Sequence, residues 1–215
     1  MAARVRYLIP AVIAAAALCA PAANASNAGL IGTIGSLLGG NCPTGGTQVF
    51  GPWADAANYL LAPNGSFEFG TTGWTLSGGA TVVPGNEPFY PTGTHSLSLP
   101  SGSSAMSPTV CLGTKQLYIR MFGKDLGGTD SGLRVRVYWY GVLNQLLGSS
   151  DFAVFPGGGD WAPTGKVQSG GGLVEPLPVV ALLSSTSARI QVTPLGSGSR
   201  WQIDDLYIDP CIGRF

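Results

Sequence analysis

The segment 133–140 alternates along its whole length between apolar side chains and side chains that carry a charge or a hydroxyl group. Successive side chains of an extended strand point to opposite faces, so this alternation predicts a β-strand with one buried and one exposed face. The apolar set that we expect to be buried is Leu133, Val135, Val137 and Trp139. The opposite set is Arg134, Arg136, Tyr138 and Tyr140.

Shorter segments with the same alternation occur at 96–99, 117–121 and 188–192. Turn-forming residues separate them, and the 33 glycines and 16 prolines leave hardly any stretch with the spacing of an amphipathic helix. Short strands between turns predict an all-β fold, either a sandwich or a barrel.

The first residues have the pattern of a secretory signal. Arg4 and Arg6 precede an apolar run at 8–20, and the small residues at 23–25 form a cleavage site. Cys19 follows Leu18 where a lipoprotein signal has a small residue, so cleavage is favoured over acylation. We therefore expect a secreted protein with a signal peptide at 1–25, a glycine-rich leader at 26–58 and a sandwich domain at 59–212.

Later parts of the chain lack an apolar run of the roughly 20 residues that a membrane helix needs, so no transmembrane segment is expected. The whole chain has 11 basic and 11 acidic residues. Nucleic-acid binding normally requires a basic excess, and the longest basic cluster is 134–136. The composition therefore argues against a nucleic-acid partner.

Cys42, Cys111 and Cys211 lie after the signal peptide. In an oxidising compartment two of them should form a disulfide. We prefer the pair Cys42 and Cys111, because it would fasten the glycine-rich leader. The pair Cys42 and Cys211, which would join the two termini, remains an alternative.

The apolar positions of the segment 201–208 change parity between Ile203 and Leu206. A parity change within one strand predicts a β-bulge, here at Asp204 and Asp205. If Leu206 and Ile208 face the core, Asp204 is in phase with them and also points inward, where a carboxylate needs a partner.

Four short motifs, taken together, resemble a known family. They are LAPNGSFE at 61–68, Gly73-Trp74, GTHSLSL at 93–99 and WQIDDL at 201–206. In this order they resemble the galactose-binding-like jelly roll, and more narrowly the carbohydrate-binding modules of bacterial xylanases and glucanases. The resemblance implies a jelly-roll β-sandwich of two antiparallel sheets that binds a polysaccharide or cell-surface glycan.

The same resemblance implies a structural calcium ion held by Glu68 and Asp204, with Asp205 as the substitute for Asp204. Calcium prefers several oxygen ligands, which suits carboxylates and loop carbonyls. The alternative is that Glu68 and Asp204 only accept backbone hydrogen bonds at strand ends.

For the sugar site we expect the exposed set of 133–140 to be extended by residues from neighbouring strands. These residues are Tyr118, Arg120, Arg189 and Gln191. Tyrosine rings can stack on sugar rings while Arg and Gln bind hydroxyl or carboxylate groups. The alternative is an ordinary solvated sheet face.

The tryptophans fall into two groups. Trp74, Trp139 and Trp201 are expected in the core, whereas Trp53 and Trp161 lie in loop contexts and are free to contact a ligand.

Catalysis has little support in the sequence. His95 is the one histidine, and no Gly-x-Ser-x-Gly motif is present, which argues against a serine hydrolase. We therefore predict a non-catalytic binding module for a glycan or other extracellular ligand. The alternatives are a structural or adhesive surface scaffold and a small glycoside-active enzyme, because folding can bring two carboxylates together.

Overall fold

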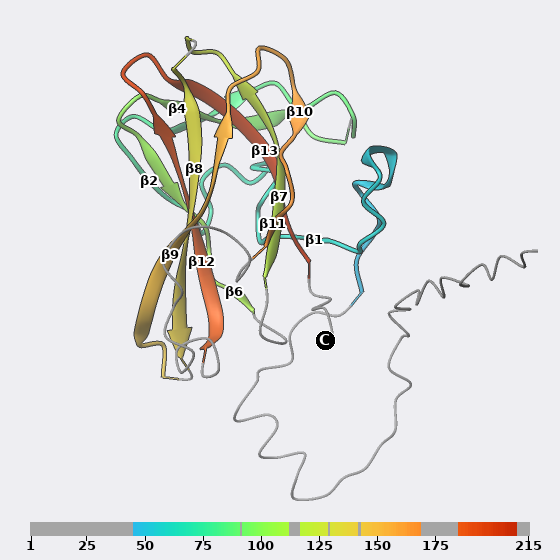
Figure 1. Ribbon diagram of the computed structural model, residues 1–215, viewed down its shortest axis with the longest axis vertical. Helices are drawn as coiled ribbons and strands as arrows, with labels where there is room; N and C mark the ends of the chain where they lie inside the picture. Colours follow the sequence, from blue (N-terminus) through green and yellow to red (C-terminus); the bar gives the residue numbers. More distant parts are fainter. Residues whose placement is uncertain are drawn as a thin grey trace, which may run out of the picture.

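Two antiparallel β-sheets stacked face to face form the protein, as the computed structural model in Figure 1 shows. The structure describes residues 45–90, 92–111, 117–128, 130–141, 143–168 and 185–209. Within these residues the one helix is the short 3₁₀ turn η1 (Gly51–Trp53), and none is long and apolar enough to cross a membrane. The predicted all-β sandwich of two antiparallel sheets is confirmed.

One sheet has seven strands in the order β10-β7-β13-β4-β3, with β1 paired to β13 and β11 paired to β7. Its strands are β1 (Leu60–Leu61), β3 (Thr81–Pro84), β4 (His95–Pro100), β7 (Tyr118–Asp125), β10 (Ala162–Pro163), β11 (Val167–Gln168) and β13 (Arg200–Asp209).

The other sheet has six strands in the order β2-β5-β12-β8-β9, with β6 paired to β12. Its strands are β2 (Thr75–Ser77), β5 (Ser104–Met106), β6 (Val110–Cys111), β8 (Gly132–Gly141), β9 (Leu146–Pro156) and β12 (Ser185–Leu195). The segment 133–140 is the centre of β8, which pairs with β12 on one side and β9 on the other.

The core lies between the sheets and is built by the alternation that the sequence shows. On β8 the apolar set from Leu133 to Trp139 is at most 1% exposed, whereas the alternate residues are half-buried. Trp74, Trp139 and Trp201 are all buried in this core, as predicted. Each buried Leu, Val or Ile contributes roughly 1.5–3 kcal/mol, so the alternation is the main stabilising feature of the sandwich.

A second apolar cluster covers the outer face of the seven-stranded sheet. Val49, Phe50 and Tyr59, from the segment ahead of β1, pack there against Phe122 of β7. The isolated pairing of Thr47 with Tyr59 closes this segment into a loop. One outer face of the sandwich is therefore covered by the chain itself.

The predicted β-bulge is present in β13. The pairing of β13 with β7 shifts register between Asp204 and Tyr207, and Asp205 has a φ of 48°. Asp and Asn are among the non-glycine residues that tolerate this left-handed conformation best.

The predicted inward direction of Asp204 is wrong. Asp204 pairs with Phe122, and paired residues share a face, so its side chain lies on the side of the second cluster. Leu206 does face the core. The extra residue of the bulge falls between these two positions, which puts them on opposite faces.

Candidate functional site

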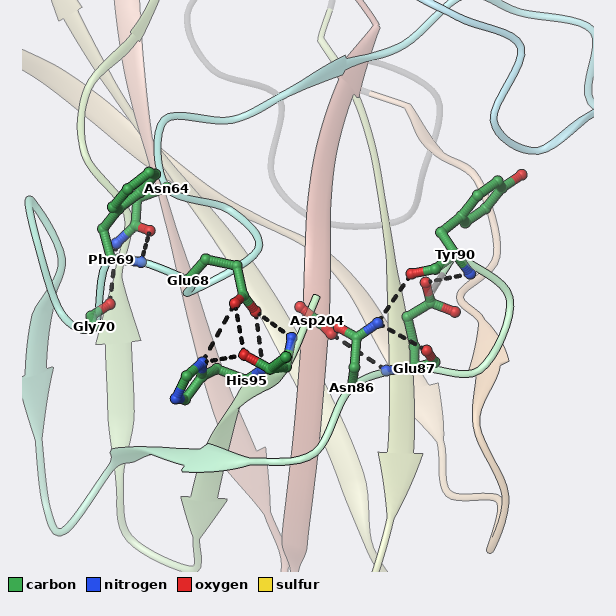
Figure 2. Close-up of polar contacts among 10 residues, drawn as sticks. Asn64, Glu68, Phe69, Gly70, Asn86, Glu87, Tyr90, His95 and Asp204 are labelled. Carbon is green, nitrogen blue, oxygen red and sulfur yellow. Dashed lines mark hydrogen bonds and ion pairs between the residues drawn. The ribbon is translucent and has the colours of Figure 1, made fainter. Parts of the chain in front are cut away.

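Four carboxylates gather where the outer face of β13 meets two loops, and we call Glu68, Glu87, Asp204 and Asp205 the acidic cluster. Figure 2 shows Glu68, Asn86, Glu87 and Asp204 in this region. Asp204 is completely buried, and its Oδ2 accepts a hydrogen bond of 3.3 Å from the backbone N–H of Glu87. The loop that contains Glu87 therefore lies over Asp204.

Glu68 is positioned by the loop that follows Asn64. The amide of Asn64 donates to the carbonyls of Gly70 and Thr72 and accepts from the N–H of Phe69. Gly65 is required here, because a Cβ atom at this position would lie 2.7 Å from the carbonyl oxygen of Leu206. The Asn-Gly pair thus folds the loop tightly against the bulge of β13.

The carboxylate of Glu68 already has several partners. It accepts hydrogen bonds from the N–H groups of Thr94 (2.7 Å) and His95 (2.8 Å) and from the Thr94 hydroxyl (2.9 Å). Burial alone would raise the pKa of Glu68, but these hydrogen bonds outweigh it and lower the pKa to about 2. Glu68 is therefore ionised and holds the start of β4.

Asp204 and Asp205 have the opposite electrostatic environment. Burial, reinforced by the charge of Asp205, raises the pKa of Asp204 to about 8. Burial and the charge of Glu87 raise the pKa of Asp205 to about 6, with a further contribution from Glu68. Among the described residues no Lys or Arg forms an ion pair with either aspartate. The two aspartates thus resist ionisation, because no basic side chain of the described residues compensates their charge.

Ser96 adds an unsatisfied oxygen close to this charge. It is completely buried, and its Oγ has no hydrogen-bond partner in the described chain. Its neighbour Leu97 pairs with Ile203, and both face the core. Ser96 and Asp204 therefore occupy adjacent positions on the outer side of neighbouring strands.

This set of groups fits a hard cation in charge and in ligand chemistry. A calcium ion would neutralise Asp204 and Asp205 and give the Ser96 hydroxyl a partner. Across the described ranges, however, no three Asp, Glu, His or Cys side chains are arranged for one metal ion. Backbone carbonyls and the amide oxygen of Asn86 would have to complete the coordination.

Six of the expected sugar-contacting residues share the outer face of the six-stranded sheet, and we call them the tyrosine–arginine face. They are Arg134, Arg136, Tyr138 and Tyr140 of β8 with Arg189 and Gln191 of β12. All six are half-buried. Tyr138 lies opposite Arg189, and Arg136 lies opposite Gln191, on the neighbouring strands β8 and β12.

Tyr118 and Arg120 do not join this face, because β7 belongs to the other sheet. Arg120 is 6% exposed and lies under the segment ahead of β1. Its guanidinium stacks 4.1 Å from the ring centre of Phe50 and pairs with Asp55. Lys166 lies 4.4 Å from the ring centre of Tyr118.

Several polar residues of the tyrosine–arginine face already bind one another. Arg136 forms a two-point ion pair with Asp151 of β9. The hydroxyl of Tyr138 donates to Gln191 at 3.1 Å, and the amide of Gln191 donates to Ser104 at 3.4 Å. The sequence did not predict Asp151 and Ser104 as partners in this face. They become neighbours of Arg136 and Gln191 only through the order of the strands, and local patterns do not indicate that order.

Trp53 and Trp161, the two loop tryptophans, both lie at the second cluster and are half-buried. Trp53 packs edge-on against Phe89, with ring centres 5.0 Å apart. Phe89 is 39% exposed, so an aromatic surface remains at the margin of this cluster.

Cys111 is the last residue of β6. Cys42 and Cys211 lie outside the described residues, as do the signal peptide and most of the leader. The pairing of Cys42 with Cys111 stays a prediction.

No protein-family model matches the chain, and no curated protein sequence matches it significantly. Among solved structures, the family 22 xylan-binding module of Paenibacillus barcinonensis is similar at 16% identity and a TM-score of 0.41, covering 71% of this chain and 94% of that one. A family 61 module (TmCBM61) in complex with β-1,4-galactotriose is similar at 20% identity and a TM-score of 0.44, covering 69% and 96%.

The enzymatically active domain of the bacteriophage CBA120 tailspike protein 4 is also similar, at 20% identity and a TM-score of 0.47. The match covers 69% of this chain but only 21% of the tailspike chain. The likeness to carbohydrate-binding modules that the motifs predicted is thus found among solved structures. At these scores it is a likeness only, and the function has to be argued from the residues.

Proposed function

We propose that the chain is a secreted, non-catalytic module that binds a glycan on its tyrosine–arginine face. The observation that carries this proposal is the convergence of Tyr138, Tyr140, Arg189 and Gln191 on one outer sheet face. Tyrosine rings offer flat apolar surface to a sugar ring, and the Arg and Gln side chains offer donors to its hydroxyl groups.

A face built from long strands suits an extended polymer better than a small molecule. β8 runs through ten residues, from Gly132 to Gly141, and lies between β12 and the edge strand β9. A polysaccharide lying across β12, β8 and β9 would contact side chains that rigid strands hold in place. Such preorganisation lowers the entropic cost of binding.

Binding without catalysis is supported by the environment of His95. Its Nδ1 contacts the Thr94 hydroxyl at 2.9 Å and the Glu68 carboxylate at 3.3 Å. This histidine therefore belongs to the polar contacts that fix the start of β4. It is far in the fold from the face proposed for the ligand, because β4 lies in the other sheet.

We further propose that the acidic cluster holds a structural calcium ion, with Asp204 and Asp205 as carboxylate ligands. The buried, uncompensated charge of these two aspartates and the unsatisfied Ser96 hydroxyl support it. Glu68 would act mainly by fixing the loop around the ion, since its oxygens are engaged with Thr94 and His95.

A structural or adhesive scaffold is the second candidate. It is favoured by the polar pairs within the tyrosine–arginine face, because Arg136 with Asp151 and Tyr138 with Gln191 satisfy much of its hydrogen bonding without a ligand. In that case the face is a solvated surface with ordinary cross-strand pairs.

Binding to a panel of soluble polysaccharides, measured by affinity electrophoresis and calorimetry, separates the two candidates. We expect binding to at least one polysaccharide, with a loss of about 2- to 10-fold in Tyr138→Ala, as estimated for one aromatic contact. Tyr118→Ala, on the other sheet, is the matched control and should bind like the native protein. Uniformly negative results would favour the scaffold.

A further inference from the structure

The six-stranded sheet carries a local positive charge although the whole chain is balanced. Its strands contain four charged residues, namely Arg134, Arg136, Arg189 and Asp151. Three arginines against one aspartate give these strands a net charge of +2. All three arginines belong to the tyrosine–arginine face, so the excess lies where we propose that the glycan binds.

The arginines differ in their partners. Arg136 is neutralised by Asp151, which accepts from its Nε and Nη2 atoms. Arg189 donates to the carbonyl of Ser107 at 2.9 Å and to the Thr75 hydroxyl at 3.3 Å, and both acceptors are neutral. Its guanidinium is therefore held in place, and no acid of the described residues forms an ion pair with it.

Arg134 is less satisfied still. Its Nε atom is buried and has no hydrogen-bond partner, and its guanidinium forms no ion pair within the described part of the chain. A buried donor without an acceptor is costly. Arg134 as a whole is half-buried, so an anionic ligand group would approach it from its exposed side and form a charge-assisted contact there.

Arg134 and Arg189 are the arginines of this face that form no ion pair among the described residues, although Arg134 is near enough to Asp151 to help lower its pKa. Arg189 pairs with Tyr138, and Arg134 precedes Tyr138 by four residues on β8. At about 3.3 Å per residue they are roughly 13 Å apart. In the direction of the strands Tyr138 lies level with Arg189, and Arg136 lies between Tyr138 and Arg134.

From these charges we infer that the glycan bound by this face is acidic, with carboxylate or sulfate groups that contact Arg134 and Arg189. This inference rests on the proposed function of the face and specifies its ligand class. Planar guanidinium groups suit both anions, because they present paired donors in a fixed geometry.

The test varies the charge of the ligand without changing its backbone. Polygalacturonate is compared with the same polymer after graded methyl esterification, and dextran sulfate is compared with dextran. We expect binding to weaken as esterification rises or as ionic strength increases. The first pair reports recognition of carboxylates, and the second pair reports recognition of sulfates.

Arg134→Gln and Arg189→Gln each should weaken binding of the acidic polymer about threefold to fivefold, as the loss of one partly exposed charge contact predicts. Arg200→Gln removes the same charge from the other sheet, where Arg200 is exposed, and should change nothing. The esterification series needs no variant, so it remains informative if an arginine variant unfolds.

Equal affinity for the charged and the esterified polymer would overturn the inference while leaving the proposed function intact. Failure to bind any polysaccharide, neutral or acidic, would instead count against the proposed function itself. Competition by single-stranded DNA at equal total charge would also overturn the inference, because it would show general polyanion binding.

Discussion

The carboxylate of Asp55 accepts a hydrogen bond of 3.0 Å from Nη1 of Arg120 and thereby joins the segment ahead of β1 to β7. The side chains of this pair are 11% and 7% exposed. Tyr59 donates to the same carboxylate at 2.7 Å, and the carbonyl of Thr164 accepts from Nε of Arg120. The covered face of the sandwich is thus closed by a buried ion pair as well as by aromatic packing.

Asp55→Ala should destabilise the protein by about 3 kcal/mol, because it leaves the Arg120 guanidinium buried without its anion. Urea denaturation followed by tryptophan fluorescence gives the free energy of unfolding. Asp160→Ala removes an exposed acid from a loop and should change stability by less than about 0.5 kcal/mol. An Asp55→Ala protein as stable as the native one would show that the pair contributes nothing.

The stability of the protein in EDTA should fall as the pH rises from about 4 to about 8. Asp204 and Asp205 have raised pKa values of about 8 and 6 when folded, so the unfolded chain loses these protons at lower pH than the native protein does. Folding is therefore favoured below their unfolded pKa, and this advantage is lost as the pH passes through the folded pKa values. Melting temperatures across this pH range measure the effect.

The carboxylates with lowered pKa values do not obscure that window. The folded pKa values of Asp55 and Glu68 are lowered, so their contribution to stability is lost only as the pH falls below about 4. Asp204→Asn should flatten the decline between pH 4 and 8. A melting temperature that is constant or rises across this range in EDTA would contradict the assignment of buried, uncompensated aspartates.

Calcium should raise the melting temperature at about pH 7, and EDTA should reverse the increase, because a cation compensates the charge of Asp204 and Asp205. Differential scanning calorimetry with and without calcium is the measurement. Asp204→Asn should abolish the response. If calcium leaves the native protein unchanged, the acidic cluster holds no such ion.

Asp205→Asn should make the metal-free protein more stable at about pH 7 and reduce its response to calcium. Asparagine tolerates the left-handed backbone that position 205 adopts, with a φ of 48°, so the change removes charge without straining the bulge. Asp205→Val removes the same charge but is poorly tolerated in that conformation, and it should destabilise the protein. Equal stability of the two variants would argue against a bulge at this position.

Tyr138→Phe should bind the glycan nearly as well as the native protein, because it keeps the aromatic ring and loses only the hydroxyl that donates to Gln191. Comparison of its dissociation constant with that of Tyr138→Ala separates ring stacking from hydrogen bonding. If Phe and Ala reduce binding equally, the hydroxyl and its partner Gln191 are the contact, and stacking has no part in it.

The tyrosine–arginine face was predictable because its information is local. Alternation along 133–140 determines which side chains point outward, and the same holds for Arg189 and Gln191 on β12. The sequence contains no comparable signal for sheet membership. Tyr118 and Arg120 alternate in the same way, yet β7 lies in the opposite sheet, and only the strand order shows this.

The acidic cluster was predictable only in part. The parity change at 201–208 correctly indicates a bulge, but it leaves open on which side the extra residue falls, and Asp204 lies opposite to the expected side. Glu87 was not expected in the cluster, because it is separated from Asp204 by 117 residues and reaches it through a loop. Such contacts depend on tertiary packing, which local patterns do not encode.

In the part of the chain that the structure describes, the segment ahead of β1 packs on the outer face of the seven-stranded sheet, whereas the tyrosine–arginine face belongs to the other sheet. A polysaccharide bound to the tyrosine–arginine face would therefore lie on the side of the sandwich opposite to this segment. The segment would then not compete with the polymer for the same surface.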